Sequence, residues 1–368
     1  MHCTVLVNGL HAKTGGGVTY LRNVLPYLAA DAELELHLCL HLDQQGVFEP
    51  VDKRIQVHYA GFGGGFYRRL VWEQAVLPFI ARRLGADVTF SPANFGPLLA
   101  PRPVILLRNA LAVWGEERRL GKRLYWLALS LMTKASLAFC RHAIAVSEYA
   151  GAALSGGASR RTRKRVSVVH HGVGEAFTPP QPDKGREDFL LCVGDIYIQK
   201  NLHRLIEALG RVRDVFPDVR LKVAGRPVDE EYAGLVGSLI AQYGLGGNVE
   251  LLGHVATQDL LEAYRRCALM VFPSTVETFG NPLLEAMACG APIVSANTTA
   301  MPEVLDDAAL FFDPRNPDHM AECILVALGD AELRKELSEK GLARSKDFSW
   351  RRTGERTASI LKDCVRRR

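Results

Sequence analysis

The sequence predicts an α/β protein with two Rossmann-like, doubly wound domains in tandem. Short apolar segments typical of buried strands alternate with segments whose apolar residues recur at helical spacing. Such alternation favours parallel sheets with helices on both faces. The chain has 368 residues, of which 48% are hydrophobic and 23% charged. This composition is typical of globular proteins, and the length suits two domains.

The first half of the chain contains several short apolar runs. The predicted strands are 5–7, 34–40, 55–59, 88–90, 104–107, 143–146 and 166–169, and the predicted helices are 23–30 and 68–84. A stretch rich in proline and polar residues follows at 177–185, and this composition indicates a linker between the domains.

The second half alternates more regularly. The predicted strands are 189–193, 220–224, 249–252, 269–272, 293–295 and 309–312, and the predicted helices are 202–215, 229–243, 258–265, 282–289 and 317–328. A last helix is expected to start within 347–350. Ligands of doubly wound sheets bind beyond the carboxyl ends of the strands, so we expect chemistry directly after each strand, in a cleft between the domains.

Charge is unevenly distributed along the chain. Residues 1–172 hold 21 Lys and Arg against 11 Asp and Glu, a balance of +10, whereas residues 173–368 hold 24 against 29, a balance of −5. The basic half favours an anionic partner, either nucleic acid or anionic lipid, with a solvated face as the alternative. Since no nucleic-acid-reading motif is present, we expect no nucleic-acid partner.

The cysteine pattern and the hydropathy exclude several other classes. None of the eight cysteines forms a C-x-x-C pair, which argues against a zinc or redox site and favours buried free thiols over disulfides. No apolar run reaches the roughly 18 residues of a membrane-spanning helix, and the N-terminus does not have the pattern of a signal peptide. We therefore expect a cytoplasmic protein.

The strongest local feature is the segment 273–286, where a predicted strand ends, a loop follows and a helix begins. Asn281 suits the N-cap position and Pro282 the first helical position. Free N–H groups at such a helix start can hold phosphate oxygens, and Gly280 lets a ligand approach the backbone.

Two carboxylates flank this helix start. Glu285 has apolar neighbours and is expected to be partly buried, so that it needs hydrogen-bond donors, which the two hydroxyls of a sugar diol supply. Glu277 lies in the preceding loop. The alternative is that Glu285 caps a backbone and that Glu277 is a solvated loop acid.

Residues 273–294 read P-S-x-x-E-T-F-G-N-P-L-L-E-A-M-A-C-G-A-P-I-V, with Glu277 and Glu285 in a Glu-x7-Glu motif. This string resembles the signature of retaining GT-B glycosyltransferases of the group-1, or family-4, type. The resemblance extends to the Gly-rich loop at 15–17, to A-V-S-E at 145–148 and to V-G-D-x-x-x-Q-K-N at 193–201.

The resemblance implies a GT-B fold of two Rossmann-like domains that face each other across a cleft. Residues 1–172 would form the acceptor-binding domain, with the last helix, about 350–368, crossing back to it. A linker at 173–187 and a nucleotide-sugar-binding domain at 188–349 would follow.

The resemblance also implies roles for single residues. Lys200 would neutralise the diphosphate of the donor, Glu277 would lie at the donor sugar or the reacting centre, and Glu285 would bind the ribose. Lys200 as a mere surface lysine is the alternative. The remaining expected donor contacts are Gly16, Gly17, Gly194, His254, Val255, Phe279, Gly280, Asn281 and Pro282.

The sequence departs from the family pattern at two places. Where many members carry a second diphosphate-binding arginine, this chain has Asp195 and Gln199, and Arg226 is the candidate replacement. Where many members carry a His-Asp pair on the acceptor side, it has Arg108 and Asn109, which we consider as phosphate or acceptor contacts.

The implied function is retaining transfer of a hexose from a nucleotide diphosphate sugar to a glycan or lipid-linked acceptor in polysaccharide or lipopolysaccharide synthesis. No Asp-x-Asp motif is present, so neither metal nor cofactor is expected. The basic first half contains the pairs Arg68-Arg69, Arg82-Arg83, Arg118-Arg119 and Lys122-Arg123 and a basic run at 160–165, several of them next to apolar or aromatic residues such as Tyr67 and Tyr125. This pattern fits peripheral docking on the inner face of the plasma membrane. The alternatives are a GT-B sugar-nucleotide epimerase and a non-catalytic GT-B-fold subunit.

Overall fold

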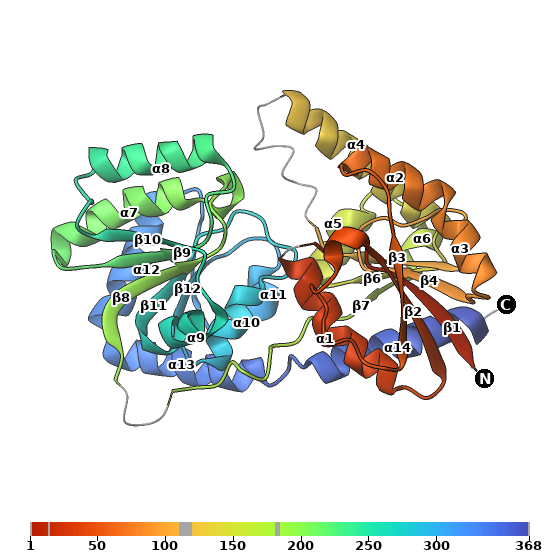
Figure 1. Cartoon of the computed structure of the whole chain (residues 1–368). Coiled ribbons are helices and arrows are strands. Elements are labelled where there is room, and N and C mark those ends of the chain that lie inside the picture. The colour runs from red at the N-terminus through yellow and green to blue at the C-terminus, as the bar shows by residue number, and fades with distance from the viewer. Residues whose placement is uncertain (1, 14, 110–119, 181–184, 367–368) are drawn as a thin grey trace. The chain divides into compact units, whose positions relative to one another are not determined.

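In a computed structural model of the chain, residues 2–13, 15–109, 120–180 and 185–366 are described. They form two compact units, which we call unit 1 (residues 1–172 and 349–368) and unit 2 (residues 173–348). Figure 1 shows a twisted sheet with flanking helices in each unit.

Unit 1 contains a parallel sheet of seven strands in the order β3-β2-β1-β4-β5-β6-β7. The strands are β1 (Cys3–Asn8), β2 (Leu34–His41), β3 (Ile55–Ala60), β4 (Val88–Ser91), β5 (Pro103–Leu107), β6 (His142–Ala145) and β7 (Val166–Val168). The helices are α1 (Gly16–Ala30), α2 (Phe66–Ala75), α3 (Leu77–Arg83), α4 (Leu120–Phe139), α5 (Glu148–Ser155), α6 (Arg160–Arg163) and α14 (Trp350–Arg366). The strand order reverses between β1 and β4.

Unit 2 repeats this topology with six parallel strands in the order β10-β9-β8-β11-β12-β13. The strands are β8 (Glu187–Val193), β9 (Leu221–Ala224), β10 (Val249–Gly253), β11 (Cys267–Phe272), β12 (Ile293–Ala296) and β13 (Leu310–Phe312). The helices are α7 (Leu202–Val215), α8 (Glu230–Gln242), α9 (Thr257–Arg266), α10 (Asn281–Ala288), α11 (Met301–Leu305), α12 (Pro317–Gly329) and α13 (Ala331–Ser345). This is the Rossmann strand order 3-2-1-4-5-6, with its switch point between β8 and β11.

Each predicted strand is present, and most of the predicted helices are close to their expected bounds. The predicted helix at 68–84 is instead two helices, α2 and α3, because Pro78 has no N–H for a continuous helix and lies in the first turn of α3. The predicted helix at 23–30 begins earlier, at Gly16. Helices α4, α5, α6, α11 and α13 were not predicted.

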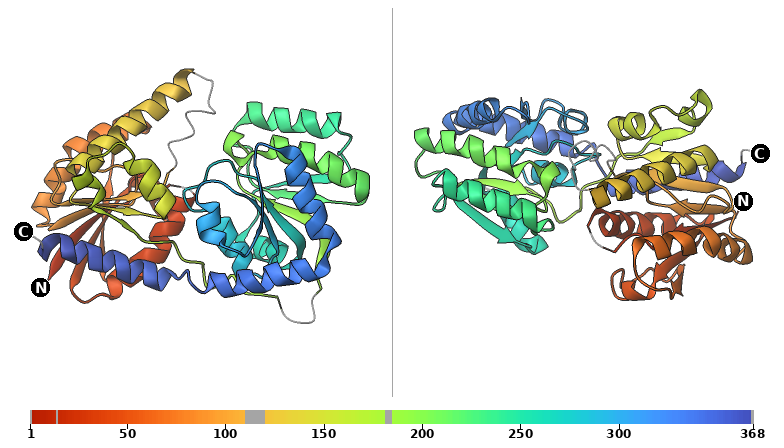
Figure 2. Two further views of the ribbon diagram at one scale, coloured as in Figure 1. Left: turned by 180° about the vertical axis from the view of Figure 1, so that it is seen from behind. Right: turned by 90° about the horizontal axis from the view of Figure 1, so that it is seen from above.

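The helices cover both faces of each sheet (Figure 2). In unit 2, α7 contacts α8 and α12, whereas α10 contacts α9 and α13. In unit 1, the C-terminal helix α14 packs against α1. Gly354 allows this approach, because a Cβ atom there would lie 2.4 Å from Cβ of Tyr27.

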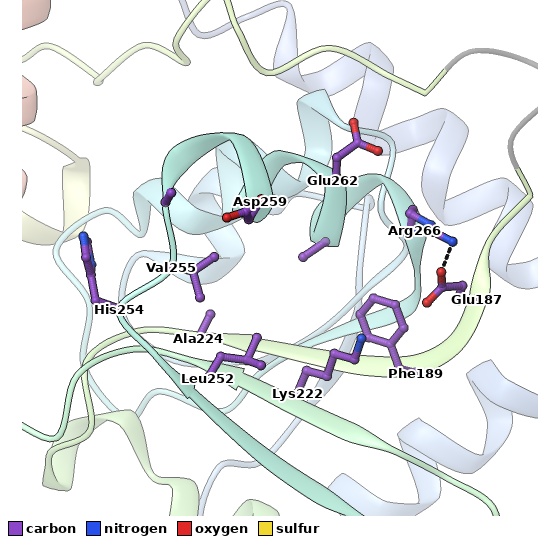
Figure 3. A pocket seen from close by; sticks show the side chains of 12 residues that line it. Glu187, Phe189, Lys222, Ala224, Leu252, His254, Val255, Asp259, Glu262 and Arg266 are labelled. Atoms are coloured by element: carbon purple, nitrogen blue, oxygen red, sulfur yellow. Dashed lines mark ion pairs between the residues drawn. The ribbon is translucent and has the colours of Figure 1, made fainter.

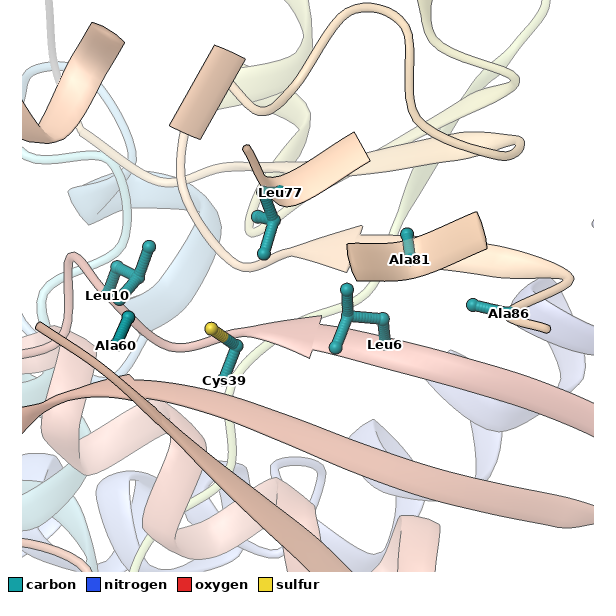
Figure 4. Close-up of a cluster of buried hydrophobic side chains, with 7 residues drawn as sticks. All are labelled: Leu6, Leu10, Cys39, Ala60, Leu77, Ala81 and Ala86. Carbon is teal, nitrogen blue, oxygen red and sulfur yellow. The ribbon is translucent and has the colours of Figure 1, made fainter. Parts of the chain in front are cut away.

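Buried aliphatic side chains fill the space between the sheet and the helices. One cluster in unit 1 joins Leu6 and Cys39 of the sheet to Leu77 and Ala81 of α3 (Figure 4). All eight cysteines are buried and free, as predicted. Among the described residues, no helix is both long and apolar enough to cross a membrane.

Replacing Leu6 with alanine should lower the free energy of unfolding by about 2–5 kcal/mol, because the side chain has no exposed area and its loss leaves a cavity. Leu99→Ala is the control, since this leucine is 68% exposed, and its effect should stay within about 0.5 kcal/mol. Urea unfolding followed by circular dichroism measures both. Equal effects of the two substitutions would contradict this packing.

Candidate active site

The candidate site in unit 2 is built on two loops at the carboxyl edge of its sheet. One loop follows β8 and the other follows β11, and these two strands are hydrogen-bonded neighbours. Since the strand order reverses between them, the helices that follow these loops pack on opposite faces of the sheet, and doubly wound sheets bind their ligands at such a switch point. The first loop carries Lys200, and the second carries Glu277.

The two loops meet in an ion pair. Nζ of Lys200 lies 2.6 Å from Oε1 of Glu277. Only 12% of the lysine side chain and 17% of the glutamate side chain are exposed. Burial alone would lower the pKa of Lys200, but the opposing charge of Glu277 raises it above its usual range. Lys200 is therefore a fixed cation, and neither residue is the solvated surface group of the alternative interpretation.

Backbone and amide hydrogen bonds hold these loops together. The N–H of Thr275 donates to the carbonyl of Gln199 at 2.9 Å. Nδ2 of Asn201 donates to the carbonyls of Pro273 at 3.0 Å and of Pro314 at 2.8 Å. Asn201 is fully buried and left-handed, with φ of 57°. It positions the lysine loop, and it was not predicted as a site residue, although it directly follows Lys200 in the quoted motif.

Gly194 makes room for the stem of Lys200. Its φ is +150°, and a Cβ atom there would lie 2.9 Å from Cε of Lys200. Gly225, after β9, supports the same turn, because a Cβ atom at that position would lie 2.0 Å from the carbonyl oxygen of Gly194. The expected donor contact Gly194 thus has a direct steric role beside the lysine.

Helix α10 begins one residue earlier than the sequence predicts. Gly280 is the N-cap, with φ of 93° and ψ of 60°, and Asn281 is the first helical residue. The predicted N-cap at Asn281 is therefore wrong, because the left-handed turn that starts the helix favours glycine. Pro282 is the second helical residue rather than the first, and it still lies in the first turn of the helix. Phe279 is buried against Phe348, so only its backbone is available to a ligand.

Glu285 lies on α10 and accepts a hydrogen bond from the hydroxyl of Tyr264 on α9 at 2.9 Å. Burial raises the pKa of Glu285 to about 7, although the hydrogen bond from Tyr264 acts in the opposite direction. Among the described residues, Tyr264 is the sole side chain that donates to this carboxyl group. Glu285 therefore does not cap a backbone, and Tyr264 is a partner that the sequence analysis missed.

Arg226 follows β9 and lies beside the lysine loop. Its guanidinium is 3.4 Å from the carboxylate of Asp195, and its backbone N–H donates to the same group at 3.0 Å. The candidate replacement Arg226 thus pairs with Asp195, one of the two residues at which the sequence departs from the family pattern. About half of the Arg226 side chain, 49%, is exposed.

His254 and Val255 line a different part of unit 2. With Ala224 and Asp259, they contribute to a pocket of about 420 Å³ between α9 and the strands β8, β9 and β10 (Figure 3). The opposite end of this pocket is closed by the ion pair of Arg266 and Glu187. Lys200, Glu277 and Glu285 do not line it.

The candidates in unit 1 gather at the carboxyl edge of its sheet. Gly15 is the N-cap of α1, so Gly16 and Gly17 of the predicted Gly-rich loop belong to the first turn of this helix. A Cβ atom at Gly17 would lie 3.2 Å from both terminal nitrogens of Arg108, which places these two candidates in contact. Burial lowers the pKa of Arg108 to about 10, which still leaves it protonated at neutral pH.

Asn94 fixes the loop that carries Arg108 and Asn109. Its side-chain oxygen accepts the backbone N–H groups of these two residues at 2.8 and 3.0 Å. Asn94 is buried, and it follows β4 closely in the sequence. The sequence signal for Asn94 is its position shortly after the strand β4, where we expect functional residues.

A buried carboxylate near the switch point of unit 1 was also missed. Glu73, on α2, accepts a hydrogen bond from Nδ2 of Asn8 at the end of β1. Its other oxygen lies 3.9 Å from Nε of Arg69. Burial raises the pKa of Glu73 to about 7 despite these partners. Nothing in its sequence neighbourhood marked this residue, because its role depends on the packing of α2 against β1.

In the described parts of the chain, no group of three or more His, Cys, Asp or Glu side chains could hold a metal ion. Arg118 and Arg119 lie outside the described residues.

Residues 175–344 match the family model of the group 1 glycosyl transferases. Over 180 residues the chain is 32% identical to the O-antigen chain mannosyltransferase B of Escherichia coli, and the alignment covers 48% of this chain and 46% of that protein. The chain thus spans about half or less of the length of the curated relatives it matches. The family resemblance found in the sequence is confirmed over this region.

Solved structures confirm the fold class. Sucrose-phosphate synthase from Thermosynechococcus elongatus has a TM-score of 0.80 at 17% identity, covering 98% of this chain and 99% of that chain. Anabaena HepE in complex with UDP-glucose has a TM-score of 0.76 at 18% identity, covering 98% and 100%. The fold is that of GT-B glycosyltransferases, with two Rossmann-like domains.

Glu285→Gln should change the free energy of unfolding in a pH-dependent way. Relative to the wild type, the variant should be more stable at pH 8 than it is at pH 5. The pKa of Glu285 is about 7 in the folded chain and about 4.3 in an unfolded one, so its ionisation costs folding free energy as pH rises between these values. Glu285 is partly exposed, which reduces this cost. We expect the stability difference between variant and wild type to change by about 2 kcal/mol from pH 5 to pH 8. Urea unfolding at four pH values measures it. Parallel pH curves for the two proteins would contradict it.

Proposed function

We propose that this chain is a retaining hexosyltransferase that takes its sugar from a nucleotide diphosphate sugar. The observation that carries the proposal is the buried ion pair of Lys200 and Glu277 beside the start of α10. Lys200, whose pKa is raised, and the start of α10, where the helix dipole is positive, form a position at the switch point that favours negative charge. A departing diphosphate requires such a position.

In this proposal Lys200 exchanges part of its contact with Glu277 for a phosphate oxygen of the donor. The amides around Gly280 and Asn281 hold the second phosphate, because a helix start favours an anion. Glu277, freed in part from the lysine, accepts hydroxyl hydrogen bonds of the hexose. The charge on the leaving group is balanced by these groups, so the step needs no divalent ion.

The chemical step exchanges one bond for another. The bond between the anomeric carbon and the phosphate oxygen breaks, the acceptor oxygen bonds to the same face of that carbon, and the acceptor proton passes to the departing phosphate oxygen. Lys200 stabilises the negative charge as it develops. No carboxylate becomes a covalent nucleophile.

Glu285 is proposed to bind the ribose hydroxyls, with Tyr264 holding its second oxygen in place. The pocket beside His254 and Val255 is the proposed position of the base. Anabaena HepE is described with UDP-glucose, which supports a nucleotide sugar as donor. The mannosyltransferases among the relatives make mannose the first hexose to test.

The acceptor is proposed to bind at the carboxyl edge of unit 1. Arg108 supplies a partly buried cation there, and Glu73 supplies a carboxyl group that titrates near neutral pH. These groups suit an acceptor that carries both phosphate and hydroxyl groups. A lipid-linked glycan intermediate in lipopolysaccharide or O-antigen synthesis has that chemistry, and the name of the Escherichia coli relative supports it.

Lys200→Ala and Glu277→Ala should each lower kcat/KM for sugar transfer by at least about 10³-fold, which corresponds to about 4 kcal/mol of lost transition-state stabilisation. Lys346→Ala is the matched control, because Lys346 is exposed in a loop of the same unit, and its activity should equal that of the wild type. Wild-type rates in either site variant would overturn the assignment.

Loss of one partner leaves a partly buried charge unpaired, so the folded state of each variant must be checked. Circular dichroism and thermal melting serve this purpose, and the double variant Lys200→Met, Glu277→Gln removes both charges together. Donors are chosen by thermal-shift screening against UDP-, GDP-, ADP- and dTDP-sugars. Epimerised nucleotide sugar without acceptor would indicate an epimerase, and a folded chain that binds no nucleotide would indicate a non-catalytic subunit.

Peripheral docking on an anionic membrane, at the inner face of the plasma membrane, is proposed for helices α2, α3 and α4. Tyr67, Val71 and Phe79 are 64%, 67% and 65% exposed, and Leu131 is 58% exposed. Exposed apolar side chains interleaved with arginines such as Arg68 suit the headgroup region of anionic lipid. Phe66 of α2 contacts Tyr125 of α4 at a ring-centroid distance of 5.0 Å, which joins two of the helices into one surface.

The double substitution Val71→Asp, Leu131→Asp should abolish most binding to phosphatidylglycerol vesicles at low salt, because it places two charges on the apolar surface. Val215→Asp, Val326→Asp is the control, since these valines of unit 2 are 60% and 48% exposed. Vesicle sedimentation measures binding, with phosphatidylcholine vesicles for comparison. If the wild type does not sediment with anionic vesicles, the membrane proposal fails.

A further inference from the structure

The amino edge of the sheet in unit 1 carries a second cavity, of about 440 Å³. Its wall combines the residues that precede and begin β6 and β7 with one face of α14. In a parallel sheet, the amino ends of all strands lie at one edge and the carboxyl ends at the other. This cavity therefore lies at the edge of the sheet opposite to the start of α1 and the loop that carries Arg108.

The lining of this cavity is strongly basic. It includes the four cations Arg141, Lys164, Arg165 and Arg356 against the single carboxylate of Asp363. Among the described residues, no hydrogen bond or ion pair engages the side chains of Arg141, Lys164 or Arg356. Like charges around one cavity repel one another, and a bound anion relieves this repulsion.

Part of the wall is held in place by the protein itself. Nη1 of Arg165 donates to the carbonyl of Cys140 at 2.6 Å, which fixes the guanidinium beside the end of α4. His142 and Ser167, on neighbouring strands, are in hydrogen-bond contact at 2.9 Å. Arg165, His142 and Ser167 thus form a fixed polar part of the wall, and the three remaining cations line the same cavity.

We propose that this cavity binds a small anion that carries a phosphate group and a hydroxyl group. Arginine side chains match phosphate oxygens with paired N–H donors, and Lys164 adds a point charge. Asp363 in the same wall favours a ligand that also offers a hydroxyl donor. Glycerol phosphate has this chemistry, either as a soluble molecule or as the headgroup of a phospholipid. The proposal does not depend on the activity proposed above.

The delta methyl group of Ile360 is a local reporter, because this residue lines the cavity. Methyl NMR of isoleucine-labelled protein, with Ile360→Val for assignment, would follow titrations with glycerol 1-phosphate, with inorganic phosphate and with phosphatidylglycerol nanodiscs. A saturable shift of this methyl signal is expected. A shift with soluble glycerol 1-phosphate identifies a free phosphate ester as ligand, and a shift with nanodiscs alone identifies the lipid headgroup.

The triple variant Arg141→Gln, Lys164→Gln, Arg356→Gln should weaken this binding more than about tenfold, because three charge-assisted contacts are lost. The control Lys53→Gln, Arg160→Gln, Arg163→Gln removes the same charge from exposed positions of unit 1 outside the cavity and should change the affinity less than about threefold. The proposal is overturned if no titrant shifts the Ile360 signal, or if the control weakens binding as much as the triple variant.

Discussion

The ion pair between Lys200 and Glu277 is the interaction on which the candidate site depends. Two charges that are mostly removed from water are tolerated only when each has a partner, and here each partner comes from a different loop. If either loop moved away, Lys200 or Glu277 would lose its partner or become exposed to water. The pair therefore sets the spacing of the two loops at the switch point of unit 2, before any ligand is bound.

The surrounding structure is shaped by this requirement. Gly194 leaves space for the aliphatic part of Lys200, because it has no side chain. Gly225 lets the turn at Gly194 pack closely against the end of β9. Asn201 adopts a left-handed conformation and ties its loop to two other loops through its amide group. Such a conformation costs free energy for a residue other than glycine, of the order of 1–3 kcal/mol, and the buried hydrogen bonds offset that cost.

The strand pattern and much of the unit 2 site could be predicted from the sequence, because both depend on local order along the chain. Buried strands are apolar runs, and in a parallel sheet the residues that follow the strands lie at its carboxyl edge. Glu73 and Tyr264 could not be predicted, because each gains its role from a partner on another element, Asn8 and Glu285. The break between α2 and α3 could have been predicted from Pro78. The N-cap of α10 was predicted at the wrong residue, because asparagine and glycine both suit such turns.

The buried carboxylates of the two units differ in what offsets their burial. Glu277 faces a fixed cation, whereas Glu73 and Glu285 take their closest hydrogen bonds from neutral groups, the amide of Asn8 and the hydroxyl of Tyr264. Neutral donors do not cancel the desolvation of a charge, so burial raises the pKa of Glu73 and Glu285 to about 7. Near neutral pH each can accept a hydroxyl hydrogen bond when ionised and donate one when protonated, which suits groups that meet sugar hydroxyls. In the proposed mechanism the leaving group needs a permanent positive charge, and Lys200 would supply it.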